Sequence, residues 1–308
     1  MNLKKPKFWD FKEPNLIAYI LLPFAVVLQY LNNFFKRNDP FKFKIKTVCV
    51  GNIYIGGTGK TSLSIQINKI LNKKNIKTCF VKKFYIDQAD EQKLLEKEGK
   101  LFLAKTRFEA IQKAEKENYE FAILDDGLQD PSIKYDFNLV CFNTLNWKGN
   151  GLTIPAGPLR ESINNLKNYN HVFLNGNLEN IDYLKDEIQK INSEIKIHFG
   201  KYEPINLGEV NKNEKYFVFS GIGNHKTFIK MLNNYGLDII ENIEFPDHYN
   251  YKNNDIEKIV SKAKKLSAKI LTTKKDYLRL NEKYLEEIQF IEVELKIIDE
   301  NKNIESIL

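Results

Sequence analysis

A six-residue segment, Gly56 to Thr61 (GGTGKT), constrains the fold of this chain more than any other feature. It follows a β-branched run at residues 45–50 and precedes a segment whose apolar residues have helical spacing (residues 63, 67, 70 and 71). A glycine-rich turn between a strand and a helix lets backbone N–H groups approach phosphate oxygens, and the helix N-terminus adds its positive dipole end. The segment therefore predicts a P-loop that binds nucleotide phosphates.

Within this loop we expect Lys60 to reach the β- and γ-phosphates of ATP and Thr61 to ligate Mg²⁺. The strict P-loop pattern has glycine where this chain has Tyr54. The alternative, a glycine turn that only caps a helix, is disfavoured because the Lys-Thr pair and both flanking elements stand where the motif requires them. The expected ATP-binding residues are Tyr54, Ile55, Gly56, Gly57, Thr58, Gly59, Lys60 and Thr61.

A second motif at residues 121–127 (FAILDDG) has four apolar residues followed by two carboxylates. This pattern is typical of a strand that delivers acids at its C-terminal edge, where P-loop enzymes hold Mg²⁺. The alternative is an ordinary Asp-Asp-Gly turn. Because a P-loop precedes the motif, we expect Asp125 and Asp126 to be metal ligands.

Strand-like and helix-like segments alternate from residue 44 onwards, which predicts βαβ units and a mostly parallel sheet. The expected strands of the first block are residues 45–50, 78–81, 121–124, 139–142 and 172–174. A second block begins near residue 216. Its expected strands are 216–219, 239–244, 269–272 and 289–294, and its expected helices are 226–234 and 255–266. Residues 195–215 contain Gly200, Pro204 and Gly208 and are predicted to be a connector.

The N-terminal segment is apolar from residue 16 to 28, carries no charge from 15 to 35, and has lysines and aromatic residues on its flanks. Pro23, Gln29, Asn32 and Asn33 interrupt the apolar run. A helix lying in the membrane interface is favoured by the interleaved aromatic and basic residues. A helix packed on the protein and a true membrane span are the alternatives.

The composition excludes several classes of protein. Three cysteines (49, 79 and 141) lie in apolar runs without a CxxC partner, and four histidines lack metal-binding spacing, so neither a disulfide framework nor a structural metal is expected. Buried thiols suit a reducing cytoplasm. The net charge of +7 favours an anionic partner, but no basic stripe indicates a nucleic-acid partner.

Two loops carry further candidates. Residues 155–161 (PAGPLRE) form a rigid loop that presents Arg160, a residue suited to bidentate phosphate or carboxylate recognition. The alternative is a surface turn with a local ion pair. Residues 245–249 (FPDHY) place Asp247 beside His248, in a position suited to proton transfer, although a lone histidine is more often structural.

These motifs in this order resemble the tetraacyldisaccharide 4′-kinase family, which phosphorylates the lipid A disaccharide precursor at the inner membrane. The resemblance covers nearly the whole chain, and the ordered set of motifs is highly specific. The matching segments are 6–9 (PKFW), 50–52 (VGN), 56–61 (GGTGKT), 123–129 (ILDDGLQ), 155–161 (PAGPLRE), 220–224 (SGIGN), 245–249 (FPDHY) and 272–276 (TTKKD).

The resemblance implies specific roles. The family's catalytic acid lies in a Gly-Asp-Glu-Pro element, which is residues 89–92 (ADEQ) here, so Asp90 is expected to accept the hydroxyl proton and Glu91 to join the metal ligands. The partner histidine corresponds to His248, and the family's arginine to Arg160. With Lys60, these are the expected catalytic residues: Asp90, His248, Lys60 and Arg160.

The chain also departs from the family pattern at three places. The usual Ser-Arg-Gly-Tyr-Gly stretch after the second strand is residues 82–86 (KKFYI), Leu152 replaces an arginine, and Tyr249 replaces a second histidine.

The sequence thus predicts a P-loop NTPase-like α/β fold with a mostly parallel sheet, a smaller second α/β domain and an N-terminal membrane-associated helix. The expected domains are residues 1–40, 41–205 and 206–308. We expect a monomeric kinase that uses ATP and Mg²⁺ to phosphorylate an acylated disaccharide 1-phosphate at the cytoplasmic face of the inner membrane, as a peripheral or monotopic protein. The alternative is a membrane-associated P-loop ATPase that acts as a switch; Ile55 stands where many such ATPases have lysine.

Overall fold

The computed structural model describes residues 5–34, 39–85, 88–179, 181–247 and 249–298, without the side chains of residues 32–34 and 89–90. The chain folds into two compact units. Of the described residues, the first contains those from Lys5 to Gly200 with Ile297 and Ile298, and the second contains those from Lys201 to Lys296. The helix at Leu16–Phe34 therefore belongs to the same unit as the P-loop.

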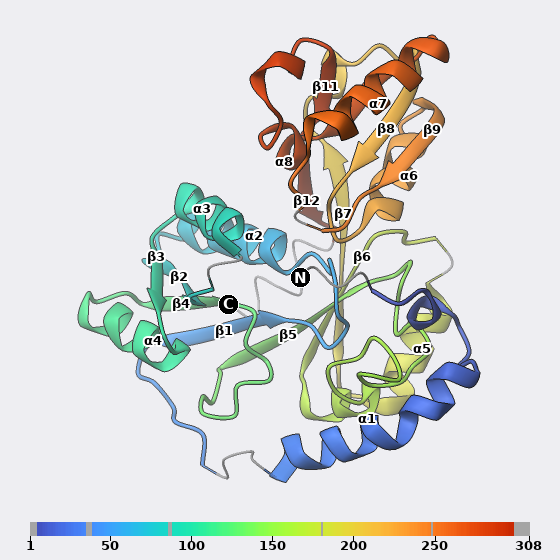
Figure 1. The fold of residues 1–308 in the computed structure, drawn as a ribbon. Helices are drawn as coiled ribbons and strands as arrows, with labels where there is room; N and C mark the ends of the chain where they lie inside the picture. Colours follow the sequence, from blue (N-terminus) through green and yellow to red (C-terminus); the bar gives the residue numbers. More distant parts are fainter. Residues whose placement is uncertain (1–4, 35–38, 86–87, 180, 248, 299–308) are drawn as a thin grey trace. The chain divides into compact units, whose positions relative to one another are not determined.

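The larger sheet has eight strands in the order β12-β7-β6-β5-β1-β4-β2-β3, and the first unit contains β1 to β6 and the start of β7, whereas most of β12 (Val293–Ile297) belongs to the second unit (Figure 1). Neighbouring strands from β7 to β3 are all parallel. The strand that precedes the P-loop, β1, lies between β4 and β5, and the chain leaves β1 towards one side of the sheet first and towards the other side later. In open α/β sheets, ligands bind at such a topological switch point. The strands are β1 (Lys46–Gly51), β2 (Thr78–Lys83), β3 (Leu101–Ala104), β4 (Phe121–Asp125), β5 (Phe137–Asn143), β6 (His171–Asn175) and β7 (Lys196–Pro204).

Helices cover both faces of this sheet. Along β2, Cys79 and Val81 pack with α4 on one face, whereas Phe80 points to the other face. The α2 helix contacts β1, β2 and β4, and the alternation of side chains places it on the Phe80 face (Figure 1). The helices are α2 (Lys60–Lys73), α3 (Ala89–Glu98), α4 (Arg107–Lys116) and α5 (Asp182–Ile191).

The N-terminal helix α1 (Leu16–Phe34) buries only a narrow stripe. Ala18 and Ala25, seven residues apart on one face, are fully buried, while most of its large apolar side chains are exposed. Gln29 fixes the helix to the site described below, because its Nε2 donates to the carbonyl oxygen of Arg160 at 3.0 Å. No helix in the described ranges has the length and apolarity required to cross a membrane.

The second unit has its own parallel four-stranded sheet in the order β11-β10-β8-β9. Alternate residues of β8 face two cores: Tyr216 and Val218 pack with α6, and Phe217 and Phe219 pack with α7. The elements are β8 (Lys215–Ser220), α6 (His225–Asn234), β9 (Asp238–Glu244), α7 (Asn253–Lys265), β10 (Lys269–Thr273), α8 (Lys274–Tyr277) and β11 (Ile288–Ile291).

One expectation about the elements is incomplete and one is wrong. The connector predicted at 195–215 does contain the point where the chain passes from one unit to the other, between Gly200 and Lys201, but this point lies within a strand, β7. The single strand predicted at 289–294 is two strands, β11 and β12 (Val293–Ile297), which belong to different sheets. The chain passes between the two units within β7 and again at the end of β12.

A buried histidine pair joins β6 to β7. His171 Nδ1 lies 3.1 Å from His198 Nε2, and His198 Nδ1 has no hydrogen-bond partner in the described part of the chain. Burial, reinforced by the charge of Lys196, lowers the pKa of His171 to about 4. Burial, with His171 and Lys196 adding to it, lowers the pKa of His198 to about 4 as well. Both rings are therefore neutral in the folded protein near pH 7.

We expect this pair to make the fold sensitive to mild acid. The unfolded histidines take up protons near pH 6.5 and the folded ones do not until about pH 4, so the free energy of unfolding should fall between these values. Each histidine contributes at most about 3 kcal/mol to this loss. Urea unfolding from pH 7.5 to 4.5 should show the slope, and His171→Leu with His198→Leu should flatten it. An unchanged slope in the double variant would contradict the assignment.

Candidate nucleotide and metal site

The P-loop runs from the end of β1 to the first turn of α2 as the sequence predicts. Gly56 (φ 125°) and Gly59 (φ 82°) both lie in the left-handed region that favours glycine, and Gly59 is the N-cap of α2. Asn175, at the end of β6, donates from Nδ2 to the carbonyl oxygen of Thr58 at 2.7 Å. The loop backbone is therefore held in place by a neighbouring strand end.

Tyr54, the departure from the P-loop pattern, anchors the loop. Its side chain is buried in the core that covers β5 and β6. The hydroxyl donates to Asp10 Oδ1 at 2.7 Å and accepts a hydrogen bond from Lys5 Nζ at 2.9 Å. Next to it, the Ile55 N–H donates to the carbonyl oxygen of Pro158 at 2.9 Å. A glycine could make none of the side-chain contacts, so tyrosine here ties the loop to the N-terminal segment.

Thr61 and Asp125 meet at the centre of the sheet. The Thr61 hydroxyl donates to Asp125 Oδ2 at 3.1 Å, because β1 and β4 are neighbours with Val50 in register with Asp125. Asp125 is fully buried. Thr61 and Asp125 were both predicted to be metal ligands, and their side chains are hydrogen-bonded to each other.

Lys82, at the end of β2, adds a positive charge next to Asp125. Its Nζ lies 2.7 Å from Asp125 Oδ2 and also bonds Glu91 Oε2, and its side chain is only 3% exposed. Burial opposes protonation of Lys82, but the charges of Asp125 and Glu91 and their hydrogen bonds outweigh it and raise the pKa of Lys82. The Lys82 ammonium group thus contacts the carboxylates of both Glu91 and Asp125.

Asp126 turns away from Asp125 towards Arg160. It has φ 65°, unusual for a residue other than glycine, and its N–H donates to the carbonyl oxygen of Val50 at 2.8 Å. Arg160 NH1 lies 3.0 and 2.9 Å from the two Asp126 carboxylate oxygens. Burial raises the pKa of Asp126, but the positive charges of Lys60 and Arg160 outweigh it, so the net shift is downward. Asp126 is therefore ionised and placed between two cations.

The oxygen donors at this site suit Mg²⁺, which binds one or two protein carboxylates together with phosphates and water. Thr61 and Asp125 are the protein ligands expected of a P-loop enzyme, and their side chains lie together. Across the described residues, no group of three or more His, Cys, Asp or Glu side chains could hold a metal alone. The roles of Asp125, Asp126 and Glu91 as ligands stay predictions, because Lys82 or Arg160 contacts each of these carboxylates.

Glu161 and Gln129 are site residues that the sequence analysis missed, although both lie inside quoted motifs. Gln129 Nε2 donates to Glu161 Oε1 at 2.9 Å and to the carbonyl oxygen of Asn52 at 3.1 Å. Glu161 is buried and accepts a further hydrogen bond from the Tyr169 hydroxyl at 2.8 Å. These contacts join the loop after β4, the segment before the P-loop and the Arg160 loop into one network.

The expected proton-transfer residues lie largely outside the described part of the structure. Asp90 falls in the first turn of α3, but its side chain is not described, and His248 lies outside the described residues. Their roles stay predictions. Glu91, the next residue in the same turn, is described and bonds Lys82.

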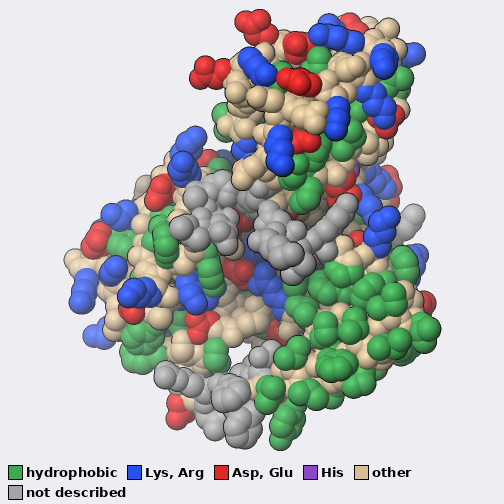
Figure 2. Space-filling model, viewed as in Figure 1, with side chains coloured by type: hydrophobic (Ala, Val, Ile, Leu, Met, Phe, Trp, Pro, Cys, Tyr) green, Lys and Arg blue, Asp and Glu red, His purple; other side chains and the backbone are tan. Residues whose placement is uncertain are grey.

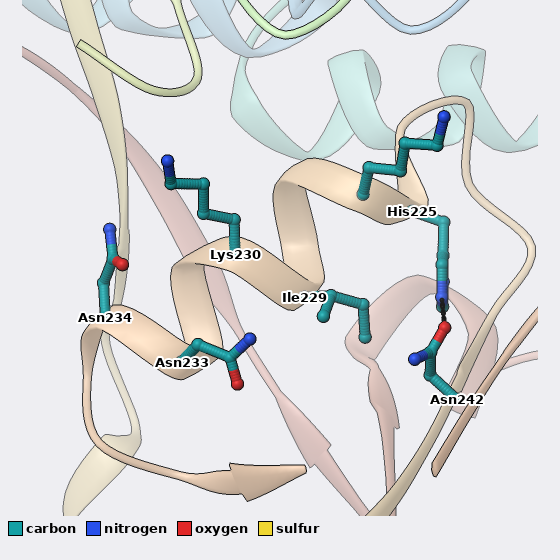
Figure 3. Close-up of a pocket in the computed structure, with 7 residues that line it drawn as sticks. His225, Ile229, Lys230, Asn233, Asn234 and Asn242 are labelled. Carbon is teal, nitrogen blue, oxygen red and sulfur yellow. Dashed lines mark hydrogen bonds between the residues drawn. The ribbon is translucent and has the colours of Figure 1, made fainter. Parts of the chain in front are cut away.

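A separate shallow pocket of about 490 Å³ lies on the second unit, beside α6 (Figure 3). His225 is held there by two neighbours: Nδ1 is 2.7 Å from Ser220 Oγ and Nε2 is 2.9 Å from Asn242 Oδ1. Both ring nitrogens are thus engaged in fixing the start of α6 against β8 and β9. The lining residues are His225, Lys226, Ile229, Lys230, Asn233, Asn234 and Asn242.

Comparison with known proteins gives consistent results. The sequence profile described as Tetraacyldisaccharide-1-P 4′-kinase matches residues 17–308. The tetraacyldisaccharide 4′-kinase of Pelagibacter ubique (strain HTCC1062) is 55% identical over 300 residues, covering 97% of this chain and 96% of that protein. The enzyme of the same name from Rickettsia canadensis (strain McKiel) is 35% identical over 324 residues, covering 98% and 95%.

The fold is shared with a solved structure. The crystal structure of LpxK from Aquifex aeolicus in complex with ATP superposes with a TM-score of 0.64, at 23% identity, and covers 93% of this chain and 97% of that one. The likeness supports the mostly parallel, P-loop NTPase-like architecture described above.

Proposed function

The chain belongs to the tetraacyldisaccharide-1-P 4′-kinase family, and on that premise we propose that it transfers the γ-phosphoryl group of ATP to the 4′-hydroxyl of a tetraacyldisaccharide 1-phosphate in lipid A biosynthesis. The observation that carries the proposal is the P-loop whose Thr61 bonds Asp125 at the β1–β4 junction. The alternative, a switch ATPase on the membrane, is not favoured, because the family resemblance extends over nearly the whole chain.

The described residues suggest how the chain stabilises the transferring group. Backbone N–H groups of the P-loop and the N-terminus of α2 bind phosphate oxygens. Lys60 adds a positive charge, and its field already acts on Asp126. Thr61 and Asp125 would hold Mg²⁺, which would neutralise part of the phosphate charge. Arg160, held by Asp126 at 2.9 Å, presents a second fixed cation at the same edge of the sheet.

We assign proton acceptance from the sugar hydroxyl to Asp90, with His248 as its partner. The assignment rests on the match of these residues to the family's Asp-Glu and Asp-His elements. The bond between Glu91 and Lys82 supports it, because it ties the first turn of α3 to the end of β4, beside the P-loop. Asp125 is better suited to metal binding than to proton transfer, since it lies at the end of β4 beside Thr61 of the P-loop.

The apolar surface of α1 suggests where the enzyme works. Figure 2 shows hydrophobic side chains gathered over this helix. Such a contiguous exposed patch marks an interaction site, and an acylated substrate would sit with its chains in a bilayer. We propose that a monomer binds peripherally to the cytoplasmic face of the inner membrane through α1. The exposed residues include Leu16, Ile17, Tyr19, Ile20, Phe24, Val26, Val27, Leu28, Tyr30 and Leu31.

Replacement of Lys60 tests phosphoryl transfer. Lys60→Ala removes a positive charge aimed at the transferring group, and we expect kcat to fall at least about a hundredfold. Lys73→Ala, at the exposed end of the same helix, is the matched control and should be near wild type. Retention of more than about a tenth of wild-type kcat by Lys60→Ala would contradict the proposed site, since one decade is only about 1.4 kcal/mol.

A double-mutant cycle tests the proton acceptor. Asp90→Asn should lower kcat by about a hundredfold or more with little change in the KM for MgATP. His248→Ala should also lower kcat, and less than additively with Asp90→Asn if the two act as a unit. Glu96→Gln, on the exposed side of α3, controls for loss of a helix charge. Near-normal turnover in Asp90→Asn would remove it as the base, and fully additive losses would break the pairing.

Point substitutions on α1 test membrane binding better than truncation, because Lys5 and Asp10 also support Tyr54. Ile20→Ser with Phe24→Ser removes two side chains that are 61% and 62% exposed, and should weaken binding to anionic vesicles about tenfold or more. Nucleotide binding should not change. Leu278→Ser, equally exposed in the second unit, is the control. Unchanged vesicle binding would show that the membrane contact lies elsewhere.

A further inference from the structure

Lys82 is the least expected residue of the site. The resemblance led us to expect a serine-containing segment after the second strand, and this chain has Lys82-Lys83 there. The Lys82 side chain is 3% exposed and contacts two carboxylates, Asp125 on β4 and Glu91 on α3. A buried lysine is rare unless it is paired, so its position is specified by those two acids.

The contacts of Lys82 coincide with the expected metal ligands. Asp125 Oδ2 accepts hydrogen bonds from both Thr61 Oγ1, at 3.1 Å, and Lys82 Nζ, at 2.7 Å. Glu91, on the other side of the ammonium group, was predicted as a metal ligand too. The second acid of the motif, Asp126, is neutralised separately by Arg160. Lys82 is therefore the cation that offsets the charge of Asp125 and Glu91 in the protein alone.

We propose that Lys82 is an internal cation that holds Asp125 and Glu91 in place of a divalent ion when no nucleotide is bound. It is a positioning residue, and the inference rests on the proposed use of MgATP at this site. Two cations that share the Asp125 carboxylate repel each other, so free Mg²⁺ should bind weakly to the nucleotide-free protein. Metal should then enter as the MgATP complex, whose phosphates supply the additional negative charge.

Removing the Lys82 ammonium group should let free divalent ions bind to the nucleotide-free protein. Without Lys82, Asp125 is a fully buried carboxylate that has lost its charged partner, which destabilises the fold. A divalent ion can then restore the missing charge. We expect Lys82→Met to melt at a lower temperature than wild type in EDTA, to recover in millimolar Mg²⁺, and to bind Mn²⁺ at least tenfold more tightly than wild type without nucleotide.

The experiment uses the full-length protein without nucleotide and follows two readouts: the melting temperature with EDTA or Mg²⁺, and Mn²⁺ binding by electron paramagnetic resonance. Lys83→Met is the matched control, because Lys83 is the next residue of β2 and faces the ring of Tyr85. It should behave as wild type in both readouts. Lys82→Arg keeps the charge and should bind Mn²⁺ as weakly as wild type.

Two results would overturn the proposal: Mn²⁺ binding to Lys82→Met that is no tighter than to wild type, or a melting temperature that Mg²⁺ does not restore. If Lys82→Met fails to fold, the wild-type protein alone can still test the proposal. A rise in its melting temperature when Mg²⁺ is added without nucleotide would show that Mg²⁺ binds despite Lys82, and would contradict the proposal. Neither readout uses the acylated substrate. A wild-type protein that lacked kinase activity would therefore overturn the proposed function and leave the Lys82 result standing.

Discussion

The register of β1 against β4 is the constraint on which the rest of the site depends. Parallel strands end at the same edge of a sheet, so the loop after β1 and the acids after β4 must lie side by side. Val50 pairs with Asp125, and the N–H of Asp126 donates to the carbonyl oxygen of Val50. A shift of one residue would turn Asp125 to the opposite face of the sheet, away from Thr61. The buried core on both faces therefore fixes the catalytic geometry as well as the fold.

Around this centre, the two consecutive acids at the end of β4 face different cations. Asp125 faces Lys82 and Asp126 faces Arg160. Asp125 is the last residue of β4, and the left-handed backbone of Asp126 ends the strand there. Adjacent carboxylates that both stay ionised would repel each other in a buried site. The two ion pairs remove that repulsion and leave Lys60 free to act on phosphate.

Much of this arrangement follows from local sequence, and the rest depends on long-range pairing. The P-loop, the acids after β4 and the parallel α/β fold are encoded in short segments whose residue types determine their chemistry. The pairing of β2 with β4, which brings Lys82 to Asp125, joins residues far apart in the chain. No helix was predicted at 89–98, and the contact between Glu91 and Lys82 was therefore not predicted either. It also treated Tyr54 as a departure, because its contacts with Asp10 and Lys5 arise from a segment predicted as a separate membrane element.

Those contacts give the N-terminal segment a second role beside its apolar surface. Tyr54 is held by Asp10, Trp9 Nε1 donates to the carbonyl oxygen of Pro155 at 3.1 Å, and Gln29 donates to that of Arg160. The helix that would touch the bilayer is thus bonded to the loop that carries Arg160, whose side chain holds Asp126. If α1 binds the membrane as proposed, these bonds would hold the phosphate site at a constant distance from the membrane surface. An enzyme that phosphorylates a headgroup while the acyl chains stay in the bilayer needs that distance fixed, because misplacing the acceptor hydroxyl by about 1 Å can cost on the order of a hundredfold in rate.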